Sequence, residues 1–167
     1  MKKTFILTIV IFYASFTGLC AQAKPELKAQ INAVLNDYYG MKDALVATDG
    51  KVTQQKSNDF LLSLAKIDMA EMTKDQHDLF MPLASKMKLE AESIAKTQEA
   101  AQQREHFNDL SNNLFTTLKA LKVNEKAVYQ QYCPMKKAYW LSDNSSIKNP
   151  YYGKMMLTCG KVTETLQ

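Results

Sequence analysis

The chain has 167 residues, of which 46% are hydrophobic and 23% are charged, and its formal net charge is +4. This length suits one domain with a conventional hydrophobic core. From residue 24 onward the chain has 19 basic and 17 acidic residues, and such a nearly neutral protein is not expected to bind nucleic acid. No stretch after residue 23 is apolar for long enough to cross a bilayer, so we expect no membrane span.

Residues 1–23 have the pattern of a secretory signal peptide. Two lysines come before a short apolar run from Phe5 to Phe12, and Ala21-Gln22-Ala23 is the small-x-small pattern that signal peptidase recognises. We therefore expect cleavage after this tripeptide and a periplasmic protein. A lipid anchor at Cys20 is the less favoured alternative, because Leu19 stands where a lipoprotein signal has a small residue.

The first two helices are expected between Pro25 and Ala70. Apolar residues from Leu27 to Leu45 recur at intervals of three, four and seven, which is the spacing of one helix face. Proline is tolerated in the first turn of such a helix, and Asp49-Gly50 is expected to end it. A second helix is expected from about Thr53 to Ala70.

Two further helices are expected before Lys122. Thr73-Lys74-Asp75-Gln76 has the form of a capping box that starts a helix, and Pro82 is expected to kink that helix or to mark its true start. One unbroken helix from Leu83 to Lys122 would be about 60 Å long, so a turn is expected near Thr97. The predicted fold class is mainly all-α, with residues 24–122 forming an antiparallel four-helix bundle.

Residues 123–167 are expected to form a C-terminal cap that packs on the bundle as part of the same domain. The cap contains the only tryptophan, five of the eight tyrosines and both cysteines outside the first 23 residues. Alternation from Val128 to Tyr132 predicts an irregular segment that can hold a short hairpin, and a final helical turn is expected from Lys161. The aromatic residues are expected to pack this segment onto the helices rather than to form a binding platform.

Two groups of sulfur-containing residues in the cap are the candidate metal site. Cys133 and Met135 stand near its start, and Met155, Met156 and Cys159 stand near its end. If the intervening chain folds back, these side chains meet. Thiolates combined with thioethers bind Cu(I) or Ag(I) better than Zn(II), and neither cysteine belongs to a zinc-binding Cys-x2-Cys pair. The residues therefore favour a site for a soft ion.

Two other states of the cysteines stay open. A Cys133–Cys159 disulfide is usual in an oxidising compartment and would stabilise the fold by about 3 to 4 kcal/mol in the chain-entropy model. The two thiols could also stay free and buried. No nucleophile-elbow, phosphate-loop or His-Glu-x2-His motif is present, so we expect no enzymatic activity.

The cap and the first helix resemble a known family. The resemblance rests on Tyr38 to Asp49 and on four segments of the cap, which are Tyr132-Cys133-Pro134-Met135, Ala138-Tyr139-Trp140-Leu141-Ser142, Ile147 to Gly153, and Met156 to Gly160. These segments are similar to the signature of the DUF3347 family of secreted Bacteroidetes proteins. Domains related to that family are fused to the periplasmic adaptor subunits of copper and silver efflux pumps.

The resemblance implies a periplasmic metal-handling role carried by Cys133, Met135, Met156 and Cys159. The Tyr-Cys-Pro-Met segment also resembles the opening of a small heavy-metal-binding module, although the histidine that follows Cys-Pro-Met there is absent and only Lys136-Lys137 links the first two cap segments. The predicted function is binding or handling of Cu(I) or Ag(I), with an efflux adaptor or another envelope protein as partner. The alternative is a metal-free envelope interaction module with a Cys133–Cys159 disulfide.

Overall fold

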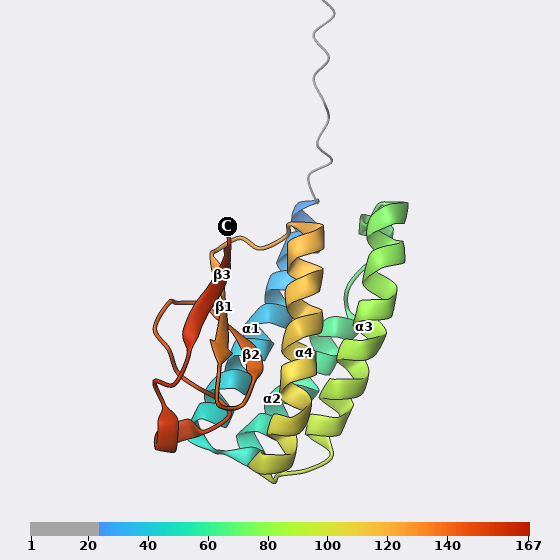
Figure 1. Ribbon diagram of the computed structural model, residues 1–167. Helices are drawn as coiled ribbons and strands as arrows, with labels where there is room; N and C mark the ends of the chain where they lie inside the picture. The colour runs from blue at the N-terminus through green and yellow to red at the C-terminus, as the bar shows by residue number, and fades with distance from the viewer. Residues whose placement is uncertain (1–23) are drawn as a thin grey trace, which may run out of the picture.

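A computed structural model of the protein describes residues 24–167 (Figure 1). The predicted signal peptide and the candidate lipid-anchor residue, Cys20, lie outside the described residues. None of the helices in the described range combines the length and the apolar character that crossing a membrane requires.

Most of the described chain is helical, which confirms the predicted fold class at this level. The four α-helices are α1 (Pro25–Ala47), α2 (Gly50–Ala65), α3 (Lys74–Ala95) and α4 (Ala100–Leu121), and a short 3-10 helix, η1 (Met69–Glu71), precedes α3. Successive helices run in opposite directions and lie side by side (Figure 1), and each packs against the next one in the chain.

Local capping sets the start of α3. Thr73 and Gln76 form the predicted capping box, in which the Gln76 N–H donates to the Thr73 hydroxyl over 3.3 Å and the Thr73 N–H donates to Gln76 Oε1 over 3.0 Å. The predicted turn near Thr97 is confirmed, because the break between α3 and α4 falls there. Pro82 lies inside α3 and therefore does not mark its start.

The prediction of a second helix from Thr53 to Ala70 is wrong at both ends. The helix begins earlier because the Asp49 carboxylate accepts a hydrogen bond from the Val52 N–H over 2.9 Å and caps α2. The helix also ends earlier, and Asp68 then accepts a hydrogen bond from the Ala70 N–H and starts η1. The predicted end of the first helix at Asp49-Gly50 is confirmed, since α1 ends at Ala47 and the Asp49 N–H donates to the Ala44 carbonyl, and the same aspartate also begins α2.

The cap contains a three-stranded antiparallel sheet. Its strands are β1 (Val128–Cys133), β2 (Ala138–Ser142) and β3 (Lys161–Leu166), in the order β2-β1-β3, and a one-turn 3-10 helix, η2 (Gly153–Met156), lies between β2 and β3. The β1–β2 hairpin agrees with the expectation. The predicted helical turn from Lys161 is wrong, because these residues pair with β1 and are rich in β-branched side chains that suit a strand.

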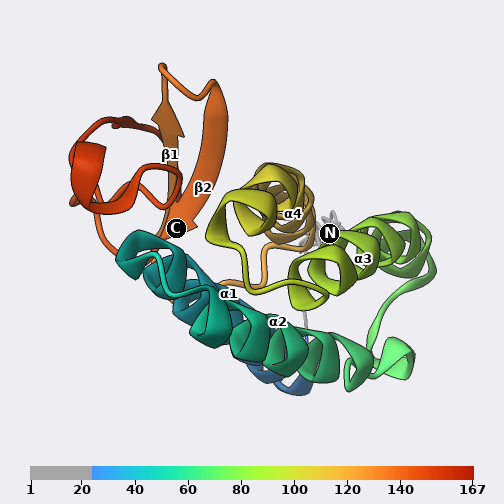
Figure 2. The ribbon, with the colours of Figure 1, turned by 90° about the horizontal axis from the view of Figure 1, so that it is seen from below.

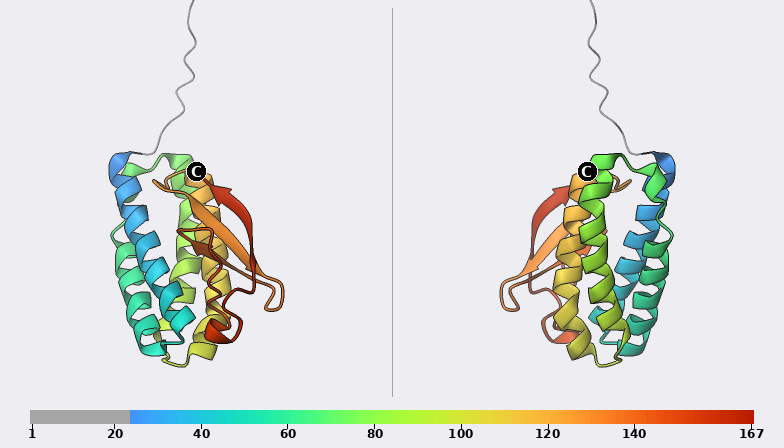
Figure 3. Two further views of the ribbon diagram at one scale, coloured as in Figure 1. Left: turned by 90° about the vertical axis from the view of Figure 1, so that its left-hand side faces the viewer. Right: turned by 90° about the vertical axis from the view of Figure 1, so that its right-hand side faces the viewer.

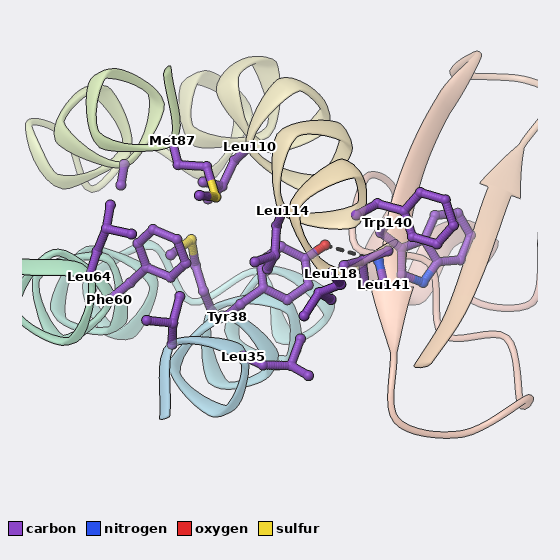
Figure 4. Close-up of a cluster of buried hydrophobic side chains, with 14 of the residues drawn as sticks. Leu35, Tyr38, Phe60, Leu64, Met87, Leu110, Leu114, Leu118, Trp140 and Leu141 are labelled. Atoms are coloured by element: carbon purple, nitrogen blue, oxygen red, sulfur yellow. Dashed lines mark hydrogen bonds between the residues drawn. The ribbon is translucent and has the colours of Figure 1, made fainter. Parts of the chain in front are cut away.

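The sheet lies against one side of the helices (Figures 2 and 3). Strand β2 packs on α4 and contacts α1, and it buries Trp140 and Leu141 completely. Figure 4 shows Leu141 facing Leu118 of α4, while the Trp140 ring lies beside β2, farther from the helices. Burial of such large apolar side chains stabilises the packing by about 1.5 to 3 kcal/mol each.

Tyr38 of α1 joins the helices to the sheet through its buried hydroxyl. The hydroxyl accepts a hydrogen bond from the Leu141 N–H of β2 over 3.0 Å and lies 2.6 Å from the Ser111 hydroxyl of α4 (Figure 4). Ser111 in turn donates to the Phe107 carbonyl, so the Tyr38 hydroxyl is the donor to Ser111. The Tyr38 ring stacks on the Phe107 ring at 5.0 Å. Burial raises the pKa of Tyr38 well above its ordinary value, so the hydroxyl stays protonated and keeps both bonds.

Removal of this hydroxyl is expected to destabilise the protein. Tyr38→Phe leaves the Leu141 N–H buried without a partner, so the free energy of unfolding in urea should fall by about 1 to 3 kcal/mol. Tyr39→Phe is the matched control, since no hydrogen bond joins the Tyr39 hydroxyl to the described residues, and it should change stability by about 0.5 kcal/mol or less. Equal effects of the two substitutions would contradict the role of Tyr38.

Candidate functional site

The sheet brings the two cysteines of the cap together. Cys133 is the last residue of β1 and is buried, while Cys159 lies two residues before β3 and is half-buried. Because β3 returns antiparallel to β1, with Lys161 opposite Tyr132, the chain places Cys159 beside Cys133. Their Sγ atoms lie 3.7 Å apart and both thiols are free. We call Cys133 and Cys159 the thiol pair.

The surroundings of the thiol pair favour a negative charge on Cys133. Burial acts to raise the pKa of Cys133, but hydrogen bonds from the Lys136 N–H, the Asn149 side chain, the Cys159 thiol and the Met135 N–H outweigh it and place the pKa below its ordinary value. The Lys136 N–H lies 3.4 Å from the Cys133 sulfur. The pKa of Cys159 is raised by burial, by its hydrogen bond to Cys133 and by the charge of Cys133. Cys133 is therefore the first of the two thiols to ionise.

The three candidate methionines differ in their surroundings. Met135 lies in the β1–β2 turn and Met155 in η2, and 65% and 80% of their side chains are exposed. Met156 is half-buried. The Met135 N–H reaches both sulfurs of the thiol pair, which places its backbone beside them. The structure thus joins the two cysteines, while coordination by Met135, Met155 or Met156 stays a prediction.

Between residues 24 and 167, no group of three or more His, Cys, Asp or Glu side chains is arranged to hold a metal ion. His106 instead lies 2.8 Å from a carboxylate oxygen of Glu90 on the neighbouring helix. A metal ion at the thiol pair would therefore need a donor of another kind, such as a methionine sulfur, to bind more than two ligands.

Asn149 holds the connection between β2 and β3 in place and was not identified from the sequence as a site residue. It is fully buried. Its side-chain amide donates to the Cys159 carbonyl over 2.7 Å and accepts from the Tyr151 N–H over 2.8 Å. Its backbone N–H donates to the Leu157 carbonyl and its carbonyl accepts from the Gly153 N–H. Two sequence signals point to this residue: it lies in the Ile147 to Gly153 segment of the family resemblance, and the proline after it disfavours helical backbone, but neither predicts this set of bonds.

Arg104 of α4 fixes the same connection to the helices. Its guanidinium donates to the Pro150 carbonyl over 2.7 Å, and to the Leu45 carbonyl and the Thr48 hydroxyl over 2.9 Å each. Burial lowers the pKa of Arg104, but an arginine stays charged at this degree of burial. One side chain therefore joins α4, the end of α1 and the segment that leads to η2.

The aromatic residues of the cap pack its interior close to the thiol pair. Trp140 and Tyr151 are buried, and the Tyr151 hydroxyl donates to the Tyr139 carbonyl. A Cβ atom at Gly160 would lie 2.7 Å from the Trp140 ring, so the indole lies directly against the residue that follows Cys159. Packing explains these rings, as expected, and Trp140 is placed to report on changes at the thiol pair.

The Asn149 amide is expected to set the acidity of Cys133. In a Cys159→Ser variant, the pKa of the remaining thiol, Cys133, should lie below the ordinary value of a cysteine. Adding Asn149→Ala should raise this pKa, because a hydrogen-bond donor to the thiolate is lost. The pH dependence of the thiolate ultraviolet absorbance measures both values, and circular dichroism verifies that each variant is folded.

Asn144→Ala is the matched control for this experiment. Asn144 belongs to the same connection but is exposed, so its loss should leave the titration unchanged. A Cys133 titration that is equally insensitive to Asn149→Ala would show that Asn149 does not act on the thiol.

Comparison with known proteins gives one match. A family model described as "Protein of unknown function (DUF3347)" matches residues 34–126. No curated protein and no solved structure matches the chain. The matched segment includes most of the helices and ends before β1, so it contains Tyr38 and Arg104 but not the thiol pair.

Proposed function

The chain belongs to the DUF3347 family, whose description states no function, and from the thiol pair itself we propose that the protein binds Cu(I) or Ag(I). The proposed protein is a non-enzymatic periplasmic accessory that buffers the ion or passes it to an efflux adaptor or another envelope protein. The helices serve as its scaffold and are interpreted as an antiparallel four-helix bundle. The pattern of residues 1–23 supports the periplasmic location.

The separation of the two sulfurs is the observation that carries the proposal. The Sγ atoms lie 3.7 Å apart, whereas a disulfide requires about 2.05 Å. Two thiolates can share one metal ion. At the zinc–sulfur distance of about 2.3 Å, their sulfur atoms lie about 3.8 to 4.0 Å apart when the sulfur–metal–sulfur angle is tetrahedral to trigonal. The cap thus holds its two best sulfur donors near the spacing that a shared ion needs.

The chemistry of the donors favours a soft ion. Thiolate sulfur binds Cu(I) and Ag(I) strongly, and the lowered pKa of Cys133 increases the fraction of thiolate at neutral pH. Met135, Met156 and Met155 are the candidate further donors. Methionine side chains are flexible and polarizable, so the exposed side chains of Met135 and Met155 can change conformation with little cost in packing.

Titration of the reduced protein with Ag(I) under anaerobic conditions tests the proposal. Trp140 is the only tryptophan and lies against Gly160, so binding at the thiol pair should change its fluorescence and saturate at one equivalent. Loss of a residue that only hydrogen-bonds to a metal ligand weakens metal binding by about 10- to 100-fold. Cys133→Ser removes a ligand itself and should weaken binding further.

Met135→Leu should also weaken binding, because it replaces a thioether near the thiol pair with a hydrocarbon. Met87→Leu is the matched control, since Met87 is buried in the helical core, and it should leave binding unchanged. Absence of stoichiometric binding, or binding of equal strength in the Cys133→Ser variant, would rule the proposal out.

The second candidate function is a metal-free envelope interaction module closed by a Cys133–Cys159 disulfide. The short distance between the free thiols favours it, because the sulfurs need to approach by only about 1.7 Å to bond. Under oxidising conditions, such a bond should raise the free energy of unfolding by about 3 to 4 kcal/mol over the reduced protein. Mass spectrometry of the protein from its native compartment distinguishes the two, because a complete disulfide that is insensitive to copper would favour this candidate.

A further inference from the structure

The cap carries an uneven distribution of charge around the thiol pair. The segment from Cys133 to Lys161 contains five lysines and one carboxylate, Asp143. The rest of the chain from residue 24 contains 14 basic and 16 acidic residues. The segment therefore has a net charge of +4, while the remainder is slightly negative, and the near-neutral total conceals this difference.

The positive charges gather at the end of the sheet that holds the thiol pair. The five positive side chains are Lys136, Lys137, Lys148, Lys154 and Lys161. All of them are exposed, and none forms an ion pair with a residue in the range 24–167. Two of them lie in the β1–β2 turn, one lies in η2, and Figure 1 shows both elements near the same end of the sheet. Asp143 lies at the opposite end, since Ser142 before it pairs with Tyr129 near the start of β1.

Apolar side chains are exposed on the same part of the protein. Met135 and Met155 are among the most exposed large hydrophobic residues of the described chain, and Leu157 and Val162 are also exposed. All four lie within four residues of a cysteine of the thiol pair. Exposed apolar groups surrounded by polar residues are typical of interaction sites. We define the basic cap face as Met135, Met155 and Leu157 together with the five lysines.

We propose that the basic cap face docks an acidic protein surface that carries its own sulfur ligands. Opposite charges guide such a partner and fix its orientation, and the exposed methionines give an adaptable apolar contact. The exchange itself rests on the proposed function. The partner's sulfur lone pairs replace those of Cys133 and Cys159 on the ion, and no electron is transferred. A partner thiol releases its proton to solvent as it binds the ion, and the released thiolates take up protons from solvent. The docking does not depend on this exchange.

A protein fits this face better than an anionic membrane does. Proteins that lie at a membrane surface expose tryptophan and tyrosine at the headgroup level, whereas the only tryptophan, Trp140, is fully buried and every tyrosine of the cap is buried or half-buried. The apolar groups that are exposed here are aliphatic or thioether side chains, and methionine is enriched at protein interfaces.

A labelled glutamate-rich peptide that contains one cysteine and one methionine is the probe, and a peptide with lysine in place of every glutamate is its control. Fluorescence anisotropy with the reduced, metal-free protein should detect binding of the acidic peptide only. We expect Lys136→Glu combined with Lys154→Glu to weaken this binding by about tenfold or more, and high salt to have a similar effect.

The matched control is Lys51→Glu combined with Lys86→Glu, which makes the same change in net charge at exposed lysines of α2 and α3. This variant should bind the peptide nearly as well as the parent protein, and Met155→Ser should bind it less well. Equal binding by the two charge-reversed variants would overturn the proposal, because the effect would then follow net charge alone.

Two further measurements separate this inference from the proposed function and from a membrane role. If Ag(I) fails to bind while peptide docking keeps its dependence on the cap lysines, the docking face is supported and metal exchange is excluded. Sedimentation with phosphatidylglycerol vesicles tests the lipid alternative. Vesicle binding that depends on the cap lysines, together with no binding of the acidic peptide, would overturn the proposal in favour of a membrane surface.

Discussion

The hydrogen bonds of the buried Asn149 are the constraint on which the thiol pair depends. The connection between β2 and β3 is long and partly buried, so its backbone polar groups need partners. Asn149 supplies four of these bonds, two from its side chain and two from its backbone, and one of them holds the carbonyl of Cys159. Because the same side chain also acts to lower the pKa of Cys133, one residue influences both halves of the pair.

The helices make this arrangement rigid through a small number of buried polar contacts. Tyr38 joins α1, α4 and β2, while Arg104 joins α4 and the end of α1 to the segment just after Asn149. Loss of the Tyr38 contact leaves a buried donor unpaired, which costs more than the bond itself contributes, while the Arg104 contacts are only partly buried. The sheet therefore cannot shift on the helices without loss at several places, and the distance between the sulfurs is maintained by parts of the chain far from it.

Local signals explain how much of this could be predicted from the sequence. The capping box at Thr73 depends on neighbouring residues, the break near Thr97 follows from the length that one unbroken helix would have, and both were predicted correctly. The end of α1 at Asp49-Gly50 was also predicted correctly, but the start of α2 was placed too late because the same aspartate also caps that helix. Strand β3 was missed because its partner lies about thirty residues earlier, with Val162 opposite Gln131, and a six-residue segment does not specify such a pairing. Convergence of the cysteines was predicted, but the role of Asn149 requires knowledge of the folded loop.

The asymmetry within the thiol pair connects the proposed site to the basic cap face. Cys133 is buried and stabilised as a thiolate by several donors, whereas Cys159 is half-exposed and its thiol is the less acidic of the two. In a soft-ion site, such a pair provides one fixed ligand and one ligand that a partner can reach. The exposed Met135 and Met155 lie within four residues of the thiol pair in the chain, and in the proposed docking an acidic protein would approach the ion from this side. A site intended only for tight storage would gain nothing from this exposure, because burying both ligands would exclude competing donors more effectively.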